Sequence, residues 1–158
     1  MKVLQSNLAC TYGKLGRDEE TMRMRCDIHA GTLRLHGAEH GYTLIEANNY
    51  AACLARLKRF EEAKSLLRKT IPVARRVFGD SKETTIRMRW YYARALYEDP
   101  AVTLDDLRES VRTLEDVEQI ARRVLGGAHP VTKAVEESLR YARATLAARE
   151  TPLPPGSA

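Results

Sequence analysis

The chain of 158 residues lacks the marks of several protein classes. None of its apolar runs approaches the roughly 20 residues that a membrane-spanning helix needs. Its start, residues 1–7, lacks the apolar stretch of a secretory signal. Aromatic residues make up only 6% of the chain, so a packed core must be mainly aliphatic. The sequence therefore predicts no membrane partner and no secretion.

Cysteine is scarce as well, and the three residues present are Cys10, Cys26 and Cys53. An odd number of cysteines without a short metal-binding spacing is typical of free thiols in a reducing compartment, so we expect a cytoplasmic protein. No histidine is in phase with Cys10 or Cys53, as a base that activates a thiol would be. The chain also has no glycine-rich loop that could bind a phosphate.

Signals of metal binding and of acid–base chemistry are weak. His36 and His40 are four residues apart, but Gly37 lies between them at an expected helix end, and no third ligand follows. The acidic pairs at 19–20 and 61–62 recur at a fixed offset, which is typical of structural positions in a repeat. We therefore predict no enzymatic activity, no cofactor, and no catalytic or metal-binding residues.

Both signs of charge are present, but they are unevenly distributed. The net charge is +5; residues 1–79 carry 14 Lys and Arg against 8 Asp and Glu, whereas residues 80–158 carry 12 against 13. A basic first half favours an acidic partner. Because basic and acidic residues alternate and no aromatic-rich basic strip occurs, we do not expect nucleic acid as a partner.

What the chain does contain is an internal repeat with a period of 42 residues. The segment that begins at Asn7 aligns with the segment that begins at Asn49, and Gly37 aligns with Gly79 at the same offset. The next equivalent glycine, Gly126, follows after 47 residues, so five residues are inserted, and a loop accommodates them at the least cost. Within each repeat, apolar residues recur at helical spacing.

This periodicity predicts an all-α fold whose helices end at suitable residues. Gly37, Gly79 and Gly126 each offer the left-handed conformation that closes a helix, and Thr103 with Asp106 resembles a capping box. We expect helices at about 2–14, 18–36, 41–57, 60–78, 82–97, 104–125 and 130–149. They form a single domain over 1–149, with repeats at about 1–37, 38–79 and 80–126, a cap helix at 130–149 and a disordered tail at 150–158.

Three motifs carry a family resemblance: Asn-Leu-Ala-x-x-Tyr at 7–12, Arg-Phe-Glu-Glu-Ala at 59–63, and Leu-Gly-x-x-His-Pro-x-Thr at 125–132. With them, residues 5–149 resemble a tetratricopeptide repeat array of the kinesin light chain-like form. The resemblance implies a right-handed α-solenoid of about three helix pairs plus a C-terminal capping helix. It also implies a non-enzymatic module for protein–protein interaction.

Two features depart from the family pattern. At the earlier repeat junctions His40 is followed by Gly41, and Lys82 replaces the family's histidine. The heptad region that would bind a motor heavy chain is absent, so nothing identifies a kinesin subunit. Because the chain begins inside a repeat, we expect a fragment of a longer protein.

In such arrays the first helix of each pair lines a concave groove that holds a peptide or a partner helix. The resemblance places Asn7 and Asn49 where the family's asparagine bonds a ligand backbone. Arg87 and Arg94 suit a carboxylate, because a guanidinium can bind it through two hydrogen bonds, and Tyr91 offers an apolar wall. The predicted partner-binding residues are Asn7, Lys14, Asn49, Arg56, Arg87, Tyr91 and Arg94.

These assignments have plainer alternatives. The asparagines can instead brace neighbouring repeats, the arginines can be solvated surface residues, and the adjacent Trp90 is expected in the core. For the whole chain, the alternative to a module that binds a protein or peptide is a self-associating scaffold segment. It would form homo-oligomers through an exposed first helix, whose apolar face bears Val3, Leu4 and Leu8.

Overall fold

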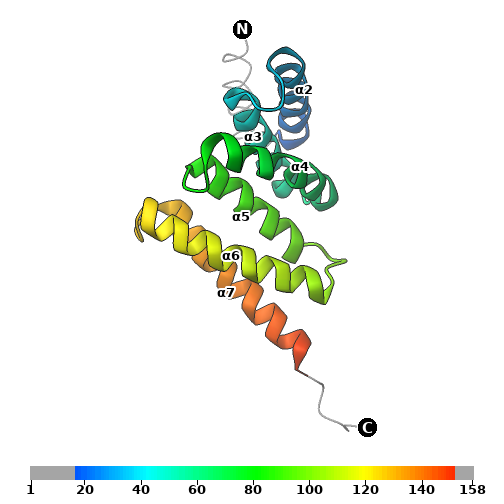
Figure 1. Cartoon of the computed structure of the whole chain (residues 1–158). Coiled ribbons are helices and arrows are strands. Elements are labelled where there is room, and N and C mark those ends of the chain that lie inside the picture. The colour runs from blue at the N-terminus through cyan, green and yellow to red at the C-terminus, as the bar shows by residue number, and fades with distance from the viewer. Residues whose placement is uncertain (1–16, 152–158) are drawn as a thin grey trace.

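The computed structural model describes residues 17–151, which form six α-helices joined by short turns. No strand occurs within these residues. Consecutive helices stack side by side from α2 at one end to α7 at the other (Figure 1), and the predicted all-α solenoid is confirmed. The helices are α2 (Asp18–His36), α3 (Gly41–Arg56), α4 (Phe60–Phe78), α5 (Glu83–Tyr97), α6 (Leu104–Val124) and α7 (Pro130–Glu150).

The observed helix ends differ from the predicted ones by at most one residue. Leu57, Lys82 and Leu125 cap their helices instead of belonging to them, and α7 includes Glu150, which was assigned to the tail. The predicted first helix at 2–14 and residues 152–158 of the predicted tail lie outside the described residues.

The 42-residue period is visible in the backbone itself. Arg17 and Arg59, which precede α2 and α4, have φ/ψ of −85°/61° and −84°/64°, and each bonds a glutamate three residues later at 2.6 Å. Gly37 and Gly79 both have φ 82°, with ψ of 171° and 168°. The positive φ expected at the helix-ending glycines is present at both and also at Gly126, where φ is 89°. The ψ of Gly37 and Gly79, however, places them in an extended region that glycine alone adopts readily, and not in the left-handed helical region.

Side chains at the repeat junctions satisfy the first backbone N–H groups of the helices. Nδ1 of His40 accepts a hydrogen bond from the N–H of Tyr42, and Nδ1 of His129 accepts one from Val131, both at 3.2 Å. These histidines are therefore helix caps, and no cluster of metal-ligating groups occurs in the described part of the chain. Lys82, at the equivalent position before α5, forms no side-chain cap.

The capping box and the proline predicted at helix starts are both present. The hydroxyl of Thr103 accepts a bond from the N–H of Asp106, whose carboxylate accepts one from the N–H of Thr103, so α6 has the predicted capping box. Pro130 occupies the first turn of α7, where a missing N–H costs nothing.

The core of the described residues consists of three apolar clusters, each formed by helices that are close in the chain. One joins α2, α3 and α4 around Met22, Leu54 and Phe60 and also includes Ala95 of α5. A second joins α3, α4 and α5, and a third joins α5, α6 and α7 around fully buried leucines and valines. Because each cluster is formed by helices that follow one another along the chain, the array is stabilised mainly by interfaces between nearby helices.

The loop between α5 and α6 holds the extra residues and is tied down by a buried ion pair. Nζ of Lys64 on α4 donates to Oδ2 of Asp99 at 2.8 Å, and the two side chains are 8% and 10% exposed. The N–H of Ala101 donates to Oδ1 of the same carboxylate at 2.9 Å. The hydrogen bond from Lys64 and that from Ala101 lower the pKa of Asp99, so the carboxylate stays charged and holds the loop against α4.

Candidate functional site

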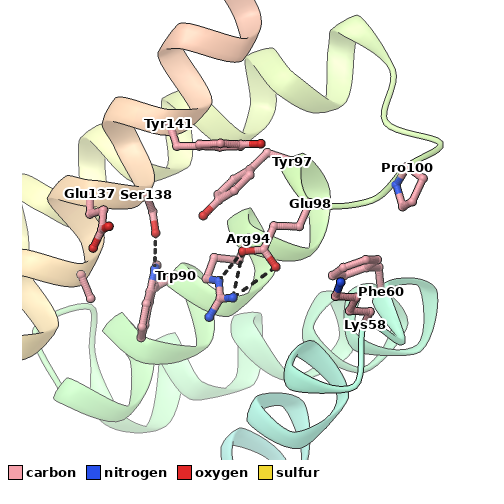
Figure 2. A pocket seen from close by; sticks show the side chains of 11 residues that line it. Lys58, Phe60, Trp90, Arg94, Tyr97, Glu98, Pro100, Glu137, Ser138 and Tyr141 are labelled. Atoms are coloured by element: carbon pink, nitrogen blue, oxygen red, sulfur yellow. Dashed lines mark hydrogen bonds and ion pairs between the residues drawn. The ribbon is translucent and has the colours of Figure 1, made fainter.

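A pocket of about 610 Å³ opens between α5 and α7. The turn that precedes α4 and the loop after α5 close it on the other sides (Figure 2). Its walls are mostly rings and charged groups. The lining residues are Lys58, Phe60, Trp90, Arg94, Tyr97, Glu98, Pro100, Ala134, Glu137, Ser138 and Tyr141.

Aromatic side chains form the wall shared by α5 and α7. The indole Nε1 of Trp90 donates to Oγ of Ser138 on α7 at 2.9 Å, which fixes the ring across the two helices. The rings of Tyr97 and Tyr141 lie with their centroids 5.4 Å apart, and Tyr141 is 59% exposed. An exposed ring on a helix face is open to a further apolar group.

Trp90 combines two environments. It is partly buried against the core cluster of α5, α6 and α7, as the core assignment predicted, and it also lines the pocket. The next residue, Tyr91, stacks on it with the ring centroids 5.0 Å apart. Sequence reasoning missed the second role of Trp90, because a helix position at the border of the apolar stripe can face both ways.

The charge in the middle of the pocket is already paired. Nε and Nη2 of Arg94 donate to the two carboxylate oxygens of Glu98 at 2.9 and 3.1 Å, and the guanidinium lies 5.6 Å from the centre of the Trp90 ring. Such a fork holds both groups in one geometry. A ligand carboxylate would therefore compete with Glu98 for Arg94.

Tyr97 presents a neutral ring. Burial raises the pKa of its phenol, while hydrogen bonds with Ser138 and Arg94 act in the opposite direction. Because the net pKa lies above its ordinary value, the phenol keeps its proton at neutral pH. The pocket wall thus offers an O–H group and ring surface without a negative charge.

Four other predicted binding residues, Asn49, Arg56, Arg87 and Tyr91, do not line this pocket. Arg87 pairs with Glu83 at 2.7 Å, and Arg56 pairs with Asp18 at 2.7 Å. Burial alone would lower the pKa of Arg87, but its hydrogen bonds with Glu83 and Tyr91 raise it, so the guanidinium stays charged. Asn49 is half-buried.

Of the seven predicted residues, Arg94 alone lines the pocket among those that the structure describes. Asn7 and Lys14 lie outside the described residues. The homo-oligomer expected through the first helix rests on residues that are likewise outside them.

The repeat offset in the sequence could have predicted the part of the pocket wall that α7 supplies. The positions Arg87, Tyr91 and Arg94, shifted by the 47-residue offset, become Ala134, Ser138 and Tyr141, and all three line the pocket on α7. By register, α7 therefore corresponds to the first helix of a repeat pair. Because it was treated only as a cap, its groove positions were not considered.

Two other hollows lie away from this pocket. One, between α6 and α7, is lined mainly by charged residues that pair with one another, such as Arg122 with Glu118 and Arg143 with Glu115. The other is an apolar crevice of about 240 Å³ where α2, α3 and α4 meet.

Within residues 17–151, no helix combines the length and low charge of a membrane-spanning segment.

Comparisons with known proteins agree with this architecture. Residues 47–81 match the family model of the tetratricopeptide repeat. A Podosopora anserina protein described as a kinesin light chain with nearly identical TPR-like repeats has a similar structure, with a TM-score of 0.77 and 20% identity over 92% of this chain and 67% of that one. A second structure of that protein gives 0.56 and 17% over 92% and 86%.

BtubC (BKLC) from P. vanneervenii is also similar, with a TM-score of 0.58 and 15% identity over 99% of this chain and 68% of that chain. A search of curated proteins gives no match. Repeats of this kind generally mediate protein–protein interaction through an extended surface. Residues 47–81 therefore match a tetratricopeptide repeat, and the described helices form a solenoid like that of kinesin light chain-like repeat structures.

Proposed function

We propose that this protein is a non-enzymatic interaction module that binds an extended segment of another protein across the first helices α5 and α7. The observation that carries the proposal is the pocket of about 610 Å³, whose wall of Trp90, Tyr97 and Tyr141 is built from both helices. Tryptophan and tyrosine rings offer a large contact area at a low cost in conformational entropy.

The surroundings of the pocket support a peptide over a small substrate. The pocket opens onto the surface, and its charges do not converge on a point where a reacting atom could be held. Arg87, Tyr91 and Arg94 continue along α5, so a segment longer than the pocket would find further polar contacts there. Because Glu83 and Glu98 already neutralise the two arginines, acidic residues of a partner would add selectivity more than affinity.

The test is a selection of peptides from a random display library against the folded chain. The chain has a single tryptophan, so the fluorescence of Trp90 reports binding in the pocket directly. We expect a selected peptide to change this fluorescence and to bind Tyr141→Ser at least tenfold more weakly, because the exposed ring is lost.

The control is Leu35→Ser, which removes an exposed apolar side chain from α2, far from the pocket. It should bind the selected peptide as the wild type does. If the peptides leave the fluorescence of Trp90 unchanged and bind both variants equally, the pocket is not the binding site and the proposal is wrong.

A further inference from the structure

Two charged residues lie at opposite ends of the pocket. Lys58 lies in the turn between α3 and α4, and Glu137 lies on α7; both are exposed. Within residues 17–151 neither side chain forms an ion pair. Figure 2 shows them on either side of the ring wall, with Arg94 between them.

The other charges of the pocket cancel locally. Arg94 and Glu98 form a two-bond ion pair, so the centre of the pocket is close to neutral. The electrostatic field that a ligand meets is therefore set by Lys58 at one end and Glu137 at the other. This field has a direction, with a positive end at the α3–α4 turn and a negative end at α7.

We infer that the pocket selects a peptide by the order of its charges, and this inference rests on the proposed function. The ligand is an extended segment of another protein that places an apolar ring or chain against Tyr97 and Tyr141. It carries a carboxylate on the side of Lys58 and a cation on the side of Glu137. The pocket should therefore distinguish two peptides of identical composition in which the two charges are exchanged.

The probe is a pair of capped heptapeptides with a central phenylalanine. One has a lysine two residues before the phenylalanine and a glutamate two residues after it; the other has these two residues exchanged, and serine fills the remaining positions. Side chains two residues apart lie on the same face of an extended peptide. Phenylalanine does not obscure the emission of Trp90, whose fluorescence measures the binding of each peptide.

We expect the wild type to bind one isomer about fivefold more tightly than the other, since exchanging the two charges replaces two attractive contacts by two repulsive ones. The variant with Lys58→Glu and Glu137→Lys has the same net charge and should prefer the other isomer by a similar factor. The preference should shrink at high salt, because both charges are exposed.

A matched control exchanges charges outside the pocket, with Lys133→Glu and Asp27→Lys, two exposed residues that do not line it. This variant should keep the preference of the wild type. Circular dichroism melting of each variant shows that the fold is retained.

The outcomes separate this inference from the proposed function. If both isomers bind equally and binding still requires Tyr141, charge order is not selected and the inference is overturned, while the peptide-binding pocket stands. If neither isomer changes the fluorescence of Trp90, the inference fails; if library peptides then also leave it unchanged, the proposed function fails as well.

Discussion

The conformation of Lys58 gives a sharp prediction about stability. Lys58 has a φ of 58°, and among residues 17–151 no other residue except glycine has a positive φ. It ends α3 in a Schellman motif, in which the N–H of Arg59 bonds the carbonyl of Leu54 at 2.9 Å and the N–H of Lys58 bonds that of Ala55 at 3.1 Å. At the equivalent position one period earlier, the sequence has Gly16.

Replacement of Lys58 by glycine should therefore stabilise the fold. A left-handed conformation costs a residue with a Cβ about 1–2 kcal/mol, and the greater freedom of glycine in the unfolded chain takes back about 0.4–1 kcal/mol. We expect a net gain of roughly 0.5–1 kcal/mol, or an increase in Tm of about 2–3 °C for a domain of this size.

Thermal and urea unfolding followed by circular dichroism measure this gain. Lys58→Ala is the matched control, because it removes the ammonium group but keeps the Cβ, and it should leave the stability within about 0.5 kcal/mol of the wild type. Arg56→Gly, inside the last turn of α3, should instead destabilise by about 1 kcal/mol. A Lys58→Gly variant no more stable than Lys58→Ala would refute the reasoning.

Three further predictions follow from the junctions and the buried polar groups. Lys82→Asp supplies the missing cap of α5 and should raise the free energy of unfolding by about 1 kcal/mol in urea denaturation. Thr85 is fully buried and its hydroxyl has no hydrogen-bond partner within residues 17–151, so Thr85→Val should stabilise by about 1 kcal/mol while Thr85→Ser destabilises; the opposite order in calorimetry would contradict this. Asp99→Asn leaves Lys64 with only the exposed Glu61 as a counter-ion and should cost about 2 kcal/mol. Because the pKa of Asp99 is lowered on folding, its contribution is present above about pH 4 and is lost as the pH falls through the folded-state pKa, so wild type and Asp99→Asn should converge in stability in acid.

The sequence predicted the helices well because their signals are local. The capping box of Thr103 and Asp106, Pro130 and the glycines after α2 and α4 all lie within a few residues of the helix ends that they set. The same holds for the backbone at Arg59, which repeats that at Arg17.

The site depended on contacts that no local pattern records. The ion pair of Lys64 and Asp99 joins residues 35 apart, and the hydrogen bond of Trp90 to Ser138 joins residues 48 apart. The helical register along α5 was enough to identify Arg94 as a binding candidate. It could not show that the guanidinium of Arg94 already forms an ion pair with Glu98. Lys58 was missed because its place in the pocket depends on the geometry of a turn.

The most direct test of the central claim is a titration of the isotope-labelled chain with a selected peptide, followed by two-dimensional NMR. The indole N–H of Trp90 gives a single resolved signal, because the chain has one tryptophan. The account predicts that this signal and the amides of Tyr97, Ser138 and Tyr141 shift together with one dissociation constant. Shifts confined to the α2–α4 crevice or to the outer face of α6, with the Trp90 signal unmoved, would contradict it.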